Sequence, residues 1–440
     1  MNLGKLLACL AASAAAMAAH AADAPLPYNA KAMHLGVVNC ASSLCHGSIT
    51  TWKDSNVLQN EFVTWSRVDK HANKAYKVLF DERSKRIARN LGLKQPPWEA
   101  KICIDCHAHN PPEEFRGERF KFADAISCEA CHGPAENWIK SHVAPNASHD
   151  ENVKNGLYPT SDPVQQARLC LSCHFGNRDK FVTHRIMGAG HPRISFELDT
   201  FAQTQPPHFA IDADWEKRKG KWDGVRVWAI GQALAAQEQL DVLLDPKRGR
   251  DGLFPELVVF DCHACHHPMS ETRWKPRVGT RPGTIRFNDA NLLMLRLIVR
   301  RVMPGDAAQF NDAVAKLHKA VAGEGGDALA EAKRLRSGLD VVISRLEKHN
   351  FNEADLAAML GNLVEDGMNG QYADYAGAEQ ATLAIGSLLN FMVKRGAVKN
   401  VREANAALDR LHEAVKDDEK FRPERFQQAL AGLQPLLRRT

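Results

Sequence analysis

The 440-residue sequence predicts a mainly α-helical protein with two unlike parts. Two observations predict this division. All cysteines beyond the first ten residues lie between residues 40 and 265, in a stretch rich in Pro, Gly, Asn and Trp. From about residue 288 onward, apolar residues instead recur with the 3.6-residue period of amphipathic helices. We therefore expect an N-terminal part with little regular structure, followed by a helical bundle.

Ten of the eleven cysteines form five pairs, and a histidine directly follows the second cysteine of each pair. The pattern C-x-x-C-H is typical of c-type haem attachment. Two thiols about one turn apart form thioethers to the haem vinyls, and the next histidine reaches the iron as its proximal ligand. Structural zinc would instead collect four ligands from two cysteine pairs, and five pairs do not divide in this way. The predicted attachment residues are Cys40, Cys45 and His46; Cys103, Cys106 and His107; Cys128, Cys131 and His132; Cys170, Cys173 and His174; and Cys262, Cys265 and His266.

The first pair departs from the pattern, because four residues rather than two separate Cys40 from Cys45. A bulged loop still allows both thiols to reach the vinyl groups, and His46 keeps its place after the second cysteine. A disulfide is the alternative, since an oxidising compartment permits one. Five covalently bound haems c are expected, and the first is the least certain of them.

The N-terminus predicts a secretory signal peptide over residues 1–21, with Lys5, a short apolar stretch and the small-residue site Ala19-His20-Ala21. Cys9 resembles the cysteine of a lipoprotein box, but it lies too close to Lys5 for an apolar core to precede it. No later segment is long and apolar enough to span a membrane. We expect a soluble periplasmic protein. The formal net charge of +5 is offset by haem propionates, so it does not indicate nucleic-acid binding.

The expected domains are a pentahaem cytochrome c domain over residues 30–280 and an α-helical domain over residues 285–440. In the first, the macrocycles act as the hydrophobic core, so little regular structure is needed. In the second, six or seven helices are expected, separated by glycines at 323–326, 367, 370 and 396, with Pro423 starting a helix. The segment Gly279–Gly283 is the expected linker. Three apolar stripes indicate helices: Leu335, Leu339, Val342 and Leu346; Ala381, Ala384, Ile385, Leu388 and Met392; and Val401, Ala404, Leu408, Leu411 and Val415.

Part of the chain resembles the cytochrome c-554 family, a family of tetrahaem proteins. The run from Cys128 to His132, followed by Gly-Pro and then by His142, is similar to the third attachment site of that family and its distal histidine. Asp69-Lys70-His71-Ala72 is similar to another distal-histidine segment. The resemblance covers about residues 35 to 180. It implies electron transfer in periplasmic nitrogen metabolism, with most haems bis-histidine and the second, at His107, five-coordinate. The lengthened first site, the fifth haem site and the C-terminal helices depart from the family.

Histidines outnumber the irons that need a sixth ligand, so their number alone does not show whether an iron is open. Glycines beside His191 allow close approach of the backbone to a haem, and the prolines at 192, 206 and 207 stiffen the loops that present His191 and His208. His34 and His109 are less favoured as ligands and could instead bond a propionate or a backbone carbonyl. The expected distal ligands are His71, His142, His184, His191 and His208.

Electron transfer is the favoured function, because bis-histidine ligation leaves redox change as the chemistry of the iron. The expected partners are periplasmic redox proteins or a membrane quinol-linked complex. The alternative is a multihaem oxidoreductase acting on a small nitrogen or sulfur compound at one open haem, with His109 as an acid near that haem. The chain contains no C-x-x-C-K motif, which marks the catalytic haem of pentahaem nitrite reductases. The sequence therefore favours a non-catalytic electron carrier.

Overall fold

The computed structural model describes residues 24–53, 55–250, 255–266 and 285–434. The fold is mainly α-helical, as predicted, and β pairing among these residues is limited to three isolated bridges. The expected signal peptide, Cys9 and the expected linker Gly279–Gly283 lie outside the described residues.

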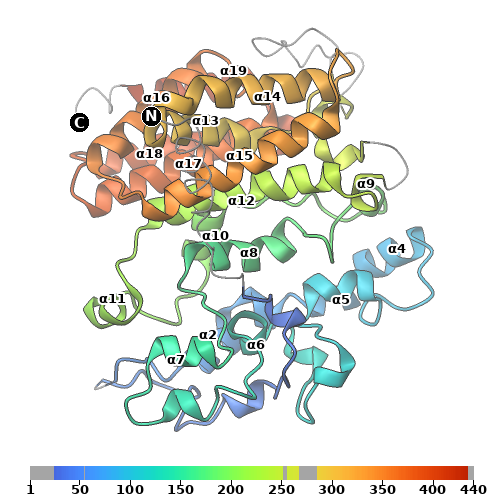
Figure 1. The fold of residues 1–440 in the computed structure, drawn as a ribbon, viewed down its shortest axis with the longest axis vertical. Coiled ribbons are helices and arrows are strands. Elements are labelled where there is room, and N and C mark those ends of the chain that lie inside the picture. Colours follow the sequence, from blue (N-terminus) through green and yellow to red (C-terminus); the bar gives the residue numbers. More distant parts are fainter. Residues whose placement is uncertain (1–23, 54, 251–254, 267–284, 435–440) are drawn as a thin grey trace, which may run out of the picture.

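The N-terminal part consists of short helices and single 3₁₀ turns joined by long irregular segments, as expected for a region organised around cofactors. Most of it lies in the lower half of Figure 1, while α9 (His184–Gly188) lies higher, level with α12 (Gly224–Leu244). Its helices are α2 (Glu61–Val68), α3 (Lys70–Asn73), α4 (Glu82–Asn90), α5 (Lys101–His107), α6 (Cys128–His132), α7 (His149–Lys154), α8 (Pro163–His174), α9 (His184–Gly188), α10 (Leu198–Thr204) and α11 (Ala213–Lys219).

The C-terminal part is a bundle of longer helices in the upper half of Figure 1. Seven helices lie between residues 285 and 434, which agrees with the expected six or seven. Leu339, Ile385 and Leu411, one from each predicted apolar stripe, are fully buried. The helices are α13 (Ala290–Val302), α14 (Ala307–Val321), α15 (Ala328–Lys348), α16 (Glu353–Met368), α17 (Tyr375–Lys394), α18 (Val401–Ala414) and α19 (Pro423–Ala431).

The predicted helix boundaries are correct with one exception. Pro423 is the first residue of α19, where its fixed φ suits the helix and its missing N–H costs nothing. Gly370 and Gly396 have positive φ and follow the ends of α16 and α17. Gly367 does not end a helix, because it lies inside the last turn of α16, where a side chain would collide with Leu430 and Tyr372.

Helix α12 (Gly224–Leu244) was not expected, because only short helical pieces were predicted before residue 280. Its 21 residues are apolar on nearly every side, so the sequence shows no amphipathic stripe there. Asp223 caps its N-terminus by accepting from the backbone N–H groups of Val225 and Arg226. A helix that is apolar all round is typically buried. In Figure 1, α12 runs beneath the bundle and above α8.

One continuous hydrophobic core joins α12 to the C-terminal helices and to α8 and α10. It includes Leu171 of α8 and Leu198 of α10 as well as Trp228 of α12, which is fully buried. The division of the chain near residue 280 stays a prediction, and the packing brings α12, from before that position, into the bundle.

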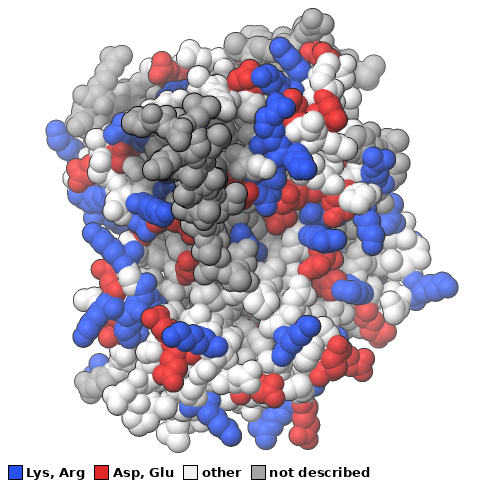
Figure 2. All heavy atoms as spheres, viewed as in Figure 1, with Lys and Arg blue, Asp and Glu red and all other residues white. Residues whose placement is uncertain are grey.

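Charged side chains of both signs are interspersed over the face of the molecule seen in Figure 2. Within the described part of the chain, none of the helices combines the length and the apolar character needed to cross a membrane.

Candidate haem sites

Three of the five predicted attachment sites lie on α-helices. The second is on α5, the third forms α6 and the fourth ends α8. The fifth lies on a 3₁₀ turn (Cys262–Ala264) that Asp261 caps. Residues three apart in a helix project from the same side, so each such turn presents both thiols together and the histidine next to them. None of the ten predicted attachment cysteines forms a disulfide, Cys40 and Cys45 included.

The lengthened first site is closed by its own backbone. The N–H of His46 donates to the carbonyl oxygen of Cys40 at 3.2 Å, and the N–H of Cys45 donates to that of Ser42 at 2.9 Å. The two extra residues are thereby folded into a compact turn, and His46 returns beside Cys40. A side chain at Gly47 would collide with the carbonyl oxygen of Ala41, only 2.0 Å from where its Cβ would lie. Glycine is therefore required after the first site.

Four of the five proximal histidines face a predicted distal histidine across a common distance. A metal–nitrogen bond of about 2 Å on each side, plus about 1 Å from nitrogen to ring centre, separates two imidazoles on one iron by about 6 Å. The observed spacings fit a haem iron between the rings. The ring centres lie 6.3 Å apart for His46 and His142, 6.4 Å for His107 and His191, 6.0 Å for His174 and His71, and 5.9 Å for His266 and His184.

His208, the fifth predicted distal histidine, lies near His132 of the third site. Burial is the largest cause that lowers the pKa of His132, to about 3, and the charge of His208 is the next. Each proximal histidine therefore has a different predicted distal histidine near it. Among the described residues, no three His, Cys, Asp or Glu side chains gather as ligands of a bare metal ion would.

Hydrogen bonds at Nδ1 leave Nε2 available on several of these imidazoles. Nδ1 of His107 bonds the carbonyl oxygen of Ala75 at 2.8 Å, and a carbonyl can only accept, so the proton sits on Nδ1. Such a bond fixes the tautomer and ring orientation of a metal-binding histidine. The same arrangement recurs at the distal histidines, where Nδ1 of His142 bonds the carbonyl oxygen of Ile139 at 2.7 Å and that of His191 bonds Pro192 at 2.8 Å.

Two other histidines bond carboxylates. Nδ1 of His46 lies 2.9 Å from Glu61. This bond raises the pKa of His46 and outweighs burial, which acts in the opposite direction. Nδ1 of His71 lies 3.1 Å from Asp69. Burial raises the pKa of Asp69, but hydrogen bonds from His71 outweigh it and lower the pKa to about 2. Neither carboxylate was predicted as a partner from the sequence. Asp69 could have been, because it lies two residues before His71.

The sites touch one another through their attachment residues. Cys40 of the first site lies beside Cys128 of the third. Cys106 of the second site likewise lies beside Cys173 of the fourth.

Asp69 and Arg193 connect the remaining sites. Burial, and after it the charge of Asp69, raises the pKa of Cys131 in the third site to about 12, so this partner of His71 also lies near the third site. Helix α9 begins at His184 and ends three residues before His191, so one short segment carries distal candidates for the fifth and second sites. Burial raises the pKa of Cys262, and the charge of Arg193, which lies nearby, acts in the opposite direction.

His34 and His109, the less favoured ligands, pair with each other. Nε2 of His109 lies 2.8 Å from Nδ1 of His34, and their ring centres are 4.5 Å apart, too close for an iron between them. Both side chains are buried, and Nε2 of His34 has no hydrogen-bond partner among the described residues. Burial lowers the pKa of His34 to about 4. Nearby, the buried carboxylate of Glu129 accepts from the N–H groups of Leu35 and Gly36 at 2.8 Å each.

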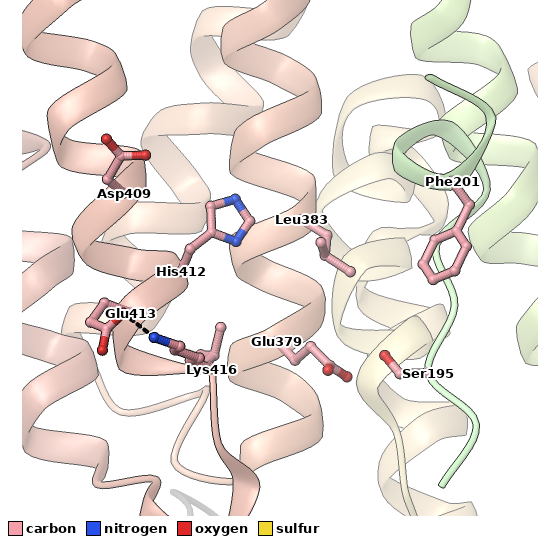
Figure 3. A pocket seen from close by; sticks show the side chains of 9 residues that line it. Ser195, Phe201, Glu379, Leu383, Asp409, His412, Glu413 and Lys416 are labelled. Carbon is pink, nitrogen blue, oxygen red and sulfur yellow. Dashed lines mark hydrogen bonds and ion pairs between the residues drawn. The ribbon is translucent and has the colours of Figure 1, made fainter. Parts of the chain in front are cut away.

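A cavity of about 540 Å³ opens between α17, α18 and α10 (Figure 3). Glu379 and Leu383 line it from α17, and His412 lines it from α18. Phe201 borders the cavity and also packs edge-on against His174 of the fourth site, with ring centres 5.7 Å apart. The cavity therefore adjoins the surroundings of a proximal histidine.

Comparison with known proteins was informative for one segment. Residues 39–133 match the family model of cytochrome c554 and c-prime. The match confirms the predicted resemblance and includes the first three attachment sites, the lengthened one among them. This likeness supports a c-type cytochrome that binds haem c covalently and acts in electron transfer. No curated protein and no solved structure matches the chain.

Proposed function

We propose that this protein is a periplasmic pentahaem electron carrier in which every iron lies between two histidines. The observation that supports this most directly is the set of facing imidazoles. Four proximal histidines have a partner ring centre at 5.9–6.4 Å, and the fifth, His132, has His208 nearby. Bound haem supplies one-electron redox change, with a potential set by its ligands and surroundings.

The protein residues hold this chemistry to electron transfer. Two imidazoles on one iron leave no position for a substrate, and the bonds at Nδ1 hold the rings in place. The resemblance to the cytochrome c-554 family implied an open second iron. The spacing of His107 and His191 favours a closed one, and with it the electron carrier over the oxidoreductase.

The contacts between sites support a single relay. Cys40 of the first site lies beside Cys128 of the third, and Cys106 of the second lies beside Cys173 of the fourth. Asp69 lies between the third and fourth sites, and α9 with Arg193 lies between the second and fifth. We infer the order first, third, fourth, second, fifth. The ends of this relay, the first and fifth haems, would exchange electrons with periplasmic redox proteins or a quinol-linked complex.

Spectroscopy of the ferric protein tests the ligation. We expect purely low-spin EPR and absorption spectra, and about one iron in five high-spin after His191→Ala, because that change removes one of ten axial imidazoles. His149→Ala is the matched control. His149 bonds Ser161 and lies opposite no predicted ligand, so its loss should leave every iron low-spin. A high-spin fraction in the unaltered protein that His191→Ala does not change would favour the oxidoreductase.

Intact-mass measurement tests the number of haems. Five are expected in the unaltered protein, and four after Cys40→Ala and Cys45→Ala are combined. Four haems before any substitution would contradict the assignment of the first site.

A further inference from the structure

Two of the three features that set this chain apart from the tetrahaem family it resembles are the fifth attachment site and the C-terminal helices. In the structure these two features pack directly on each other. The backbone N–H of Asp261 donates to the carbonyl oxygen of Arg286 at 2.9 Å, and that of Asn288 donates to Val259 at 2.8 Å. The strand-like segment before Cys262 is thus paired with the segment that leads into α13.

Arg286 connects the attachment turn to the bundle. Its guanidinium lies 2.8 Å from the carboxylate of Asp261 and 3.7 Å from that of Asp374. Each of these carboxylates caps a helical element: Asp261 accepts from the N–H of His263 in the attachment turn, and Asp374 accepts from that of Gly377 in α17. One arginine therefore ties the cap of the attachment turn to the cap of α17.

Burial makes this connection strong. The side chains of Arg286, Asp261 and Asp374 are all less than a tenth exposed. A buried charge is stable only when it is paired, and the one guanidinium pairs with both carboxylates. Removing Arg286 would therefore take away a positive charge that the two buried carboxylates share.

A second contact lies beside the first. The ring of His263, inside the attachment turn, packs edge-on against Tyr375 of α17 with ring centres 5.8 Å apart. The Tyr375 hydroxyl donates to the carbonyl oxygen of Val415 at 2.9 Å, and Arg193 lies over its ring. Arg193 also bonds Glu379 of α17 at 3.0 Å. Helix α17 thus contacts both the attachment turn and the segment that follows His191.

We propose that the C-terminal bundle holds the fifth haem in place and that Arg286 is the positioning residue that fixes the turn Cys262–Ala264 against α17. This inference rests on the proposed function, because it presupposes haem at the fifth site. It gives the extra helices a role in the relay, since they fix its last haem beside the second.

The test compares Arg286→Met with the unaltered protein by intact mass and EPR. We expect about tenfold fewer molecules with the native low-spin signal of the fifth haem. Loss of a residue that supports metal ligands without touching the metal typically has an effect of about this size. Arg286→Lys should restore part of that signal, because it keeps the charge. The other four haem signals should not change.

Arg301→Met is the matched control. Arg301 also pairs with a buried aspartate, Asp355, in the same bundle, but that pair lies between α13 and α16 and does not touch the attachment turn. The control should lower stability without changing the fifth signal. Asp374→Asn is a milder variant, because asparagine still caps α17 while its charge is lost, and a smaller shift of the same signal is expected.

Two failures are distinguishable. An unaltered protein without haem at Cys262 and Cys265 would overturn both the haem count and this inference. A protein with five haems whose fifth signal is unchanged by Arg286→Met and Asp374→Asn, or is changed equally by Arg301→Met, would overturn only the inference.

Discussion

The two halves of the molecule hold their structure by different means. Between residues 24 and 160, the hydrophobic cluster of buried side chains consists of only Leu79, Ile104 and Ala108. From α8 onward, one continuous core runs from Val164 to Leu433. Folding free energy comes mainly from apolar surface removed from water, so the second half has its own source of stability. We expect the first half to depend on bound haem for the apolar surface that its side chains do not supply.

Removing a haem from the first half tests this difference in the source of stability most directly. Replacing Cys128 and Cys131 by alanine should destabilise residues 24–160 by several kcal/mol, because binding free energy there is also folding free energy. Limited proteolysis followed by mass spectrometry should show cleavage within that range while α12–α19 stay intact. Cleavage in both regions to the same extent would show instead that the two halves fold as a unit.

A cavity made in the bundle core should lower stability and leave the haem sites unchanged. Leu388 of α17 is fully buried, so Leu388→Ala should cost about 2–5 kcal/mol in the free energy of unfolding. Urea denaturation followed by circular dichroism measures this cost, and the haem absorbance of the folded protein should be unchanged. Val341→Ala is the control, because Val341 is 53 % exposed on α15 and its truncation should shift stability by at most about 0.5 kcal/mol. Equal costs would argue against the bundle core.

A buried carboxyl group beside the fourth site predicts that stability depends on pH. Glu197 is buried and caps α10, accepting from the N–H groups of Asp199 and Thr200. Phe196, just before it, stacks on His174. Burial, and after it the charge of Asp199, raises the pKa of Glu197 from 4.5 to about 7. Between these two values the folded protein keeps a proton that the unfolded chain loses.

Stability should therefore fall as the pH rises through that window, by on the order of 3 kcal/mol. Urea denaturation at pH 5 and pH 8 measures the change, and Glu197→Gln should remove most of it. A pH dependence that persists in this variant would assign the effect to other groups.

Much of the candidate site could be predicted from the sequence, because haem attachment is a local pattern. The spacing of Cys103, Cys106 and His107 is fixed by a single turn of chain, so no knowledge of the fold is needed to find it. The apolar stripe on α17 is equally local. Helix α12 was not predicted, because it is apolar on nearly every side and its sequence therefore shows no helical period.

Which histidine faces which was not predictable in this way. His71 lies just over a hundred residues before His174, and His191 lies more than eighty after His107, so only the folded chain brings each pair to about 6 Å. The sequence was enough to predict the attachment residues, the helical class of the C-terminal part and a set of candidate ligands. Tertiary structure alone decided the pairing of the histidines, the contact of Arg286 with Asp261 and Asp374, and the place of α12, because each depends on contacts between residues far apart in the chain.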